Sequence, residues 1–80
     1  MVLVHFLNNW NNMIQTKQDE FNVHSYRELI EAISKKYPNL SKEELKSKAI
    51  SINGFLIQDP FLEKIPSNSE VHFLERLSGG

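Results

Sequence analysis

The sequence predicts a single α+β domain in which one main helix lies across one face of a mixed β-sheet. Three observations support this prediction: strand-like runs near both ends of the chain, an amphipathic segment with capping residues, and an Asn-Gly pair between two apolar runs. The predicted order is two strands, the main helix, a short helix and three further strands. Eighty residues suffice for one small domain, and no repeat or linker interrupts them.

The first part of the chain predicts two strands. Residues 2–7 are mostly β-branched, aromatic or aliphatic, and their alternation places Val2, Val4 and Phe6 on one face. An asparagine-rich stretch then breaks this run, because asparagine favours turns over strand interiors. Residues 20–24 alternate again and predict a second strand that is antiparallel to the first.

Two capping boxes predict where the helices begin. Ser25 and Glu28 have the spacing at which the serine oxygen accepts a free amide and the glutamate reaches back to the amide of Ser25. Pro38 ends the main helix. Ser41 and Glu44 repeat the spacing and predict a short polar helix. The main helix carries an apolar stripe made of Tyr26, Leu29, Ile30, Ile33 and Tyr37.

The second half predicts three strands. Residues 49–52 and 55–57 flank Asn53-Gly54, which is a strong signal for a two-residue hairpin. After two turns, residues 70–77 form the last predicted strand. The apolar content of the first and last strands predicts that they lie side by side in the middle of the sheet.

Composition excludes several classes of protein. The net charge is −1 and the basic residues are scattered, so no basic face for nucleic acid is indicated. No apolar run is long enough to span a membrane, and the first residues lack the features of a signal peptide. Without cysteine, neither a disulfide framework nor a thiolate metal site exists. We therefore expect a cytoplasmic protein that binds neither nucleic acid nor membranes.

No pattern of catalytic or metal-binding residues is present in the sequence. It contains no glycine-rich phosphate loop, no Ser/His/Asp arrangement and no paired carboxylates in an apolar setting. His5, His24 and His72 are predicted on separate strands or at a strand end, and their spacing indicates no metal site. We therefore expect no bound metal or cofactor, and no catalysis by the chain alone.

The carboxyl end is the most informative segment. Gly79 and Gly80 follow the last predicted strand with only Ser78 between, so we expect a domain over residues 1–77 and a flexible tail over residues 78–80. Two glycines without Cβ atoms can thread a narrow channel. Chemistry on the terminal carboxylate would need such a tail, whereas the alternative interpretation is an end that frays and has no role.

The residues before the tail predict a surface for a partner. If alternate residues of the last strand point into the core, the outer face carries His72, Leu74 and Arg76. Leu77 lies where a solvated tail would be expected to be polar. Insertion of Leu77 into a groove of a partner would explain its apolar character. The alternative is a half-exposed strand with a stray leucine.

Several short motifs are spread over the whole chain: Tyr37-Pro38-Asn39-Leu40, Asn53-Gly54, Asp59, Glu70-Val71 and the final Ser78-Gly79-Gly80. In this combination the chain resembles the MoaD/ThiS group of sulfur carriers, which have the ubiquitin-like β-grasp fold, and it is most similar to MoaD, the small subunit of molybdopterin synthase. It departs from the usual MoaD pattern at Glu75-Arg76-Leu77, where Pro-Pro-Val is common, and at Asn68-Ser69. These departures leave open which partner reads the tail.

The resemblance implies a sulfur-carrier function. A MoeB/ThiF-type activating enzyme would use ATP to adenylate Gly80, and sulfur would then convert the acyl-adenylate into a thiocarboxylate. The sulfur would be used by the large subunit of molybdopterin synthase, in molybdenum cofactor biosynthesis, or by a thiazole synthase for thiamine. The segment threaded into these partners would be Gly79, Ser78 and Leu77, and the adjoining contact face would be Arg76, Leu74 and His72.

Two alternatives stay open. The Arg-Leu-x-Gly-Gly ending also fits a ubiquitin-like modifier of the Urm type, whose activated Gly80 is attacked by a lysine of a target protein. The chain could also be a β-grasp binding module in which the glycines have no role. The sequence determines neither the pathway, nor the activating enzyme, nor the oligomeric state.

Overall fold

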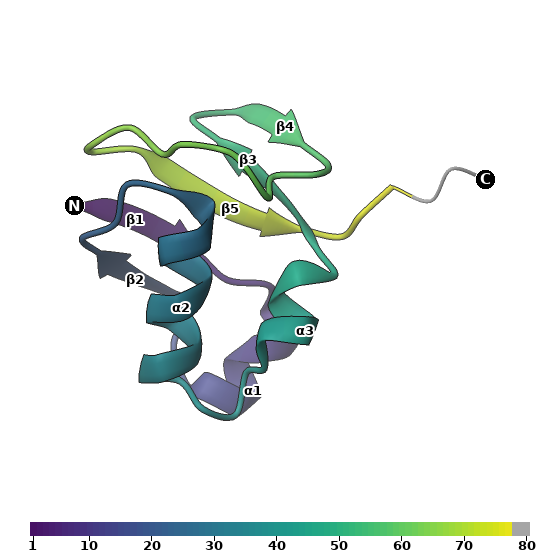
Figure 1. Cartoon of the computed structure of the whole chain (residues 1–80). Coiled ribbons are helices and arrows are strands. Elements are labelled where there is room, and N and C mark those ends of the chain that lie inside the picture. Colours follow the sequence, from purple (N-terminus) through teal and green to yellow (C-terminus); the bar gives the residue numbers. More distant parts are fainter. Residues whose placement is uncertain (78–80) are drawn as a thin grey trace.

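The computed structural model describes residues 1–77, which form one mixed sheet with helices on one side of it (Figure 1). The strands are β1 (Val2–His5), β2 (Gln18–Phe21), β3 (Ala49–Ile52), β4 (Phe55–Ile57) and β5 (Glu70–Leu74). Their order in the sheet is β2-β1-β5-β3-β4, with β1 and β5 parallel and the other pairs antiparallel. The predicted α+β class is confirmed, as is the central pairing of the first and last strands.

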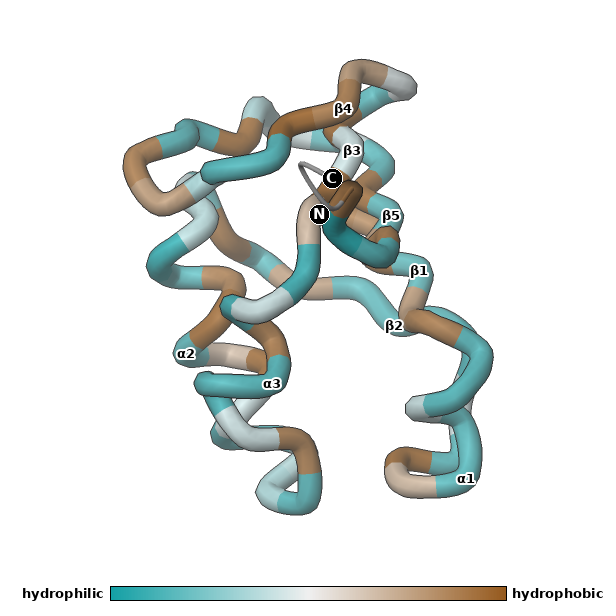
Figure 2. Tube along the Cα trace, turned by 90° about the vertical axis from the view of Figure 1, so that its right-hand side faces the viewer, coloured by the Kyte–Doolittle hydropathy of each residue, from teal (hydrophilic) through white to brown (hydrophobic). Residues whose placement is uncertain are grey.

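The helices are η1 (Asn8–Trp10), α1 (Asn11–Ile14), α2 (Tyr26–Lys36) and α3 (Lys42–Lys46). The core lies between α2 and the sheet. From the sheet side, Val4 and Val71 of the two central strands are fully buried, and from the helix side Leu29 and Ile33 are fully buried. Figure 2 shows the corresponding alternation of hydrophobic and hydrophilic residues along α2. None of the helices within residues 1–77 has the length and apolar character needed to span a bilayer.

The cap of α2 differs in one detail from the prediction. The Ser25 hydroxyl accepts the N–H of Glu28 at 3.1 Å, as predicted. The Glu28 carboxylate accepts the N–H of His24 at 2.8 Å, one residue before the predicted amide of Ser25. The helix ends at Lys36, before Pro38, as predicted.

The segment over residues 8–14, for which the sequence predicts no more than an asparagine-rich break after the first strand, forms η1 and α1. Trp10 and Ile14 are four residues apart and both are buried, so a helical turn brings them onto the core together. The indole N–H of Trp10 donates to the Glu44 carboxylate at 3.0 Å. Glu44 is also at the cap of α3, where its N–H is bound by the Ser41 hydroxyl. The hydrogen bond between Trp10 and Glu44 therefore connects η1 to α3.

Three predicted strand boundaries are wrong. The first strand was predicted over residues 2–7, but β1 ends at His5. β2 covers Gln18–Phe21 and not residues 20–24, because Phe21 pairs with Val2 and β1 offers no partner beyond it. β5 ends at Leu74 and does not continue to Leu77, because Leu74 pairs with Ala49, the first residue of β3. For β2 and β5, the strand stops where the pairing with its neighbour stops.

The predicted Asn-Gly hairpin is confirmed. Asn53 and Gly54 have φ angles of 51° and 89°, and two consecutive positive φ values are what a type I′ turn requires. The Asn53 side chain also accepts the N–H of Glu70 at 2.9 Å. The β3–β4 turn is therefore fixed to the start of β5.

A polar cluster joins β2 to the end of α2. The Lys36 ammonium lies 2.6 Å from the Asp19 carboxylate, and the Tyr37 hydroxyl donates to the same carboxylate. Partial burial by itself would raise the pKa of Asp19, but the hydrogen bonds from Lys36 and Tyr37 outweigh it and lower that pKa. Burial and the neighbouring Asp19 raise the pKa of Tyr37 to about 12.

We predict that Asp19→Asn lowers the free energy of unfolding at pH 7 by about 1–2 kcal/mol, because charge-assisted hydrogen bonds are lost. The carboxyl has a lower pKa in the folded chain than its ordinary value of 3.8, so its contribution is present above that value and disappears as the pH falls further. Urea unfolding at several pH values measures the effect. Glu20→Gln, on the same strand but in no ion pair described for residues 1–77, is the control. An Asp19→Asn deficit that is equal at pH 7 and at about pH 3 would contradict the assignment.

Candidate functional site

The outer side of β5 and the residues that follow it form the candidate site. Val71 and Phe73 point into the core, with exposed fractions of 0% and 3%. His72 and Leu74 therefore point to the opposite side of the sheet, where His72 is half-buried and Leu74 is 36% exposed. The predicted alternation along this strand is confirmed. We call His72, Leu74, Arg76 and Leu77 the β5 face.

Leu56 of strand β4 adds apolar surface to this side of the sheet. Ser51 of β3 is in register with His72 on one side and with Leu56 of β4 on the other, so these residues form a row across three strands. Leu56 is 48% exposed. Phe55, which is in register with Ile52 and belongs to the opposite face of β4, is 76% exposed. Figure 2 shows the hydrophobic stretch along β4. We did not predict these two residues as site residues, although an apolar run directly after an edge hairpin could have indicated them.

Residues 75–77 lead the chain away from the sheet (Figure 1), and polar contacts hold Glu75 and Leu77. The Lys48 ammonium lies 2.7 Å from the Glu75 carboxylate, and the N–H of Leu77 donates to the Gln58 side chain at 3.4 Å. The hydrogen bond to Glu75 raises the pKa of Lys48, against the opposing effect of partial burial. These contacts set the direction in which the chain leaves β5.

Arg76 has a different environment from the one predicted. It does not continue the outer face of β5, because the strand ends at Leu74. Its guanidinium lies 2.8 Å from the carboxylate of Asp59, in the segment that follows β4. Both side chains are substantially exposed, so the pair contributes little stability but orients the guanidinium beside the exit segment.

The end of the chain is only partly described. Leu77 is 65% exposed, which agrees with its predicted availability to a partner. Ser78, Gly79 and Gly80 lie outside the described residues, so the predicted tail and its carboxylate stay predictions.

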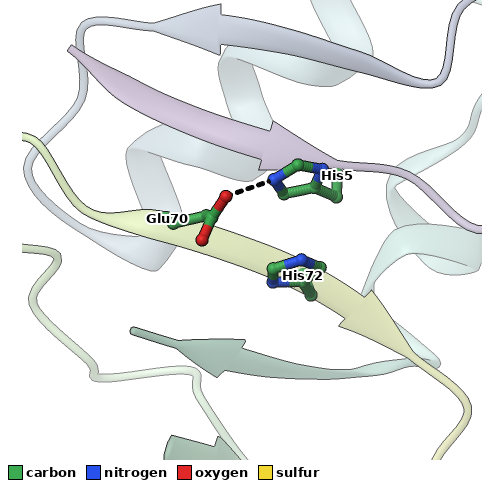
Figure 3. Close-up of side chains that lie close together, drawn as sticks. All are labelled: His5, Glu70 and His72. Atoms are coloured by element: carbon green, nitrogen blue, oxygen red, sulfur yellow. Dashed lines mark hydrogen bonds and ion pairs between the residues drawn. The ribbon is translucent and has the colours of Figure 1, made fainter. Parts of the chain in front are cut away.

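Two of the three histidines lie together: His5 of β1 and His72 of the β5 face. The rings of His5 and His72 are stacked, with centroids 4.1 Å apart and planes 7° from parallel. The His5 Nε2 atom lies 2.7 Å from a carboxylate oxygen of Glu70 (Figure 3). His24 lies in a bend before α2, and not at the end of a strand as predicted. We did not predict this group, because its members meet through strand pairing and have no characteristic spacing in the sequence.

Comparison with known proteins gives structural matches only: no family model matches the chain, and no curated protein matches its sequence. One similar structure is a chain of the protein–protein complex of subunits 1 and 2 of the molybdopterin-converting factor from Helicobacter pylori. It is 25% identical, covers 99% of this chain and 97% of its own, and has a TM-score of 0.64. SAMP1 from Haloferax volcanii is 10% identical, covers 99% and 98%, and has a TM-score of 0.66. The predicted resemblance to the MoaD/ThiS group and its β-grasp fold is confirmed.

We predict a large loss of stability for one apolar residue near the end of the described chain and almost none for another. Phe73→Ala should lower the free energy of unfolding by about 3–5 kcal/mol, because Phe73 is buried against Trp10 and Phe6. Leu77→Ser should change it by no more than about 0.5 kcal/mol, because Leu77 is 65% exposed. Thermal and urea unfolding of both variants test this contrast. A large loss of stability in Leu77→Ser would show that this residue belongs to the core and is not available to a partner.

Proposed function

We propose that this protein is a sulfur carrier whose terminal Gly80 is adenylated and then converted to a thiocarboxylate. The observation that supports this most strongly is the full-length match, at 25% identity, to a chain of the molybdopterin-converting factor. The sequence of this chain ends in Ser78-Gly79-Gly80, which provides the carboxylate for the reaction.

The chemistry explains why such a carrier needs no catalytic residues of its own. A carboxylate is a poor electrophile, so a sulfur nucleophile cannot displace its oxygen directly. ATP transfers AMP to the carboxylate and releases pyrophosphate. A sulfur donor then attacks the acyl carbon, and AMP leaves with one of the original carboxylate oxygens. The activating enzyme binds ATP and performs both steps, while the carrier supplies the glycine end and a surface that the enzyme recognises.

The proposed partners are a MoeB/ThiF-type activating enzyme and the large subunit of molybdopterin synthase. The large subunit is favoured because the similar chain belongs to a complex of subunits 1 and 2. In our proposal the β5 face is the contact surface. Leu74 and Leu77 supply exposed apolar area, and Arg76 supplies a guanidinium held by Asp59. Interfaces are enriched in arginine and in buried apolar anchors. A thiazole synthase is the alternative acceptor of the sulfur.

A ubiquitin-like modifier of the Urm type is the second candidate. Arg76 and Leu77 before the final glycines favour it. Activation of Gly80 is common to both functions, and they differ in the nucleophile that attacks the activated carbon. Sulfur would give a thiocarboxylate, whereas a lysine of a target protein would give an amide conjugate.

We predict that incubation with an activating enzyme, ATP and a sulfide source adds the mass of one oxygen-to-sulfur exchange, localised to Gly80. Intact and fragment mass spectrometry measure this change. A chain that lacks Gly79 and Gly80 should show no mass change but should keep its melting temperature, because the core and the sheet are built from residues before Leu77. Lysine-linked conjugates without a thiocarboxylate would favour the modifier. Activity that survives the deletion would favour a binding module.

We also predict that Leu74→Asp weakens binding to the large subunit by more than about tenfold, because it places a charge in an apolar contact. Isothermal titration calorimetry with the purified subunit measures the affinity. Leu62→Asp is the matched control, since Leu62 is 98% exposed but lies beside α2 with Tyr26. Equal weakening by both variants, or none by Leu74→Asp, would place the interface elsewhere.

A further inference from the structure

A group of three ligand-bearing side chains lies on the side of the sheet away from α2. A nitrogen from His5, a nitrogen from His72 and a carboxylate oxygen from Glu70 all lie within 4.8 Å of one another (Figure 3). His5 and His72 are half-buried, whereas Glu70 is exposed, so solvent ions can reach the group.

Strand pairing brings the three side chains together. β1 and β5 are parallel, and His5 and His72 are partners in their register. Glu70 is two residues before His72 on the same strand, so both side chains point to the same face. The ligand atoms therefore belong to the two central strands of the sheet. Strands hold a binding geometry more precisely than loops do.

We propose that His5, Glu70 and His72 form a binding site for a divalent transition-metal ion of the zinc class. Two imidazoles and one carboxylate are a ligand set that suits Zn²⁺ and leaves a fourth position for water. Nitrogen ligands disfavour Ca²⁺ and Mg²⁺, which prefer oxygen. The chain has no cysteine, so thiolates do not compete for the ion. This proposal does not depend on the sulfur-carrier function.

The local charge supports binding of a cation. Within residues 1–77, the ion pair described for Glu70 is the one with His5, and no lysine or arginine is paired with it. The carboxylate can therefore offer its negative charge to a metal without breaking a bond to a permanent cation. On binding, the bonds from His5 and Glu70 to the metal take the place of the contact between these two side chains.

Binding requires a defined rearrangement of the rings. Metal–ligand bonds of about 2.0–2.2 Å put tetrahedral ligand atoms roughly 3.3 Å apart. The His5–Glu70 distance of 2.7 Å is shorter than this, while the group as a whole spans up to 4.8 Å. The lone pair of an imidazole nitrogen lies in the ring plane, so two nearly parallel rings cannot aim at one ion. Rotation about the Cβ–Cγ bonds, which is soft in histidine, breaks the stack and lets the lone pairs converge.

The test is titration of the full chain with Zn²⁺ by calorimetry and with Co²⁺ by visible absorption, which reports tetrahedral coordination. We expect one ion per chain. His5→Ala, His72→Ala and Glu70→Gln should each bind at least about tenfold more weakly, because each removes one of three ligands. His24→Ala is the matched control, since it removes a histidine outside the group and should bind like the wild type.

A second measurement does not depend on the folding of any variant. In the wild-type chain, the NMR signals of the His5 and His72 rings should shift on addition of Zn²⁺, while those of the His24 ring stay in place. Circular dichroism of each variant in a chelating buffer verifies its fold. The proposal would be overturned by the absence of binding, by equal weakening in His24→Ala, or by ring shifts that include His24 and spare the other two.

Discussion

The parallel pairing of β1 with β5 is the contact on which the rest of the structure depends. It places the first and last strands in the middle of the sheet, so Val4 and Val71 lie side by side in the core. The other strands attach outside this pair, β2 to β1 and β3 to β5, and α2 covers the inner face. On the outer face the same pairing brings His5 next to His72. One register therefore determines both the packing of the core and the arrangement of the His5–His72 pair on the outer face.

Much of the fold could be predicted because its signals are local. A serine three residues before a glutamate, a periodic stripe and an Asn-Gly pair each determine the backbone over a few residues. The errors arose where distant residues decide the outcome. Residues 8–14 form helical turns in which the indole of Trp10 is buried and donates a hydrogen bond to Glu44, a residue far away in the sequence. The ends of β2 and β5 depend on where β1 and β3 stop. No local pattern carries this information.

The features of the candidate site also fall into those that local sequence predicts and those that depend on distant residues. The exposure of Leu74 and Leu77 follows from alternation along one strand and from position in the chain, so it could be predicted. The pairing of Arg76 with Asp59 could not, since it joins two segments that meet only after folding. In the proposed carrier, this pair and the Lys48–Glu75 pair hold the exit segment before the glycines. They give partners a preformed approach to an end on which all the chemistry would take place.

The central position of β5 has a consequence for synthesis of the protein. His5 of β1 pairs with His72 of β5, so the middle of the sheet cannot close until the chain has been synthesised past β5. A chain that terminates before β5 lacks both a central strand and the glycine end. Translation products that end before β5 would therefore lack the central strand pair and, in the proposed carrier, the glycine that is activated. In the proposed carrier, closure of the sheet and the presence of Gly80 thus depend on the same late part of the chain.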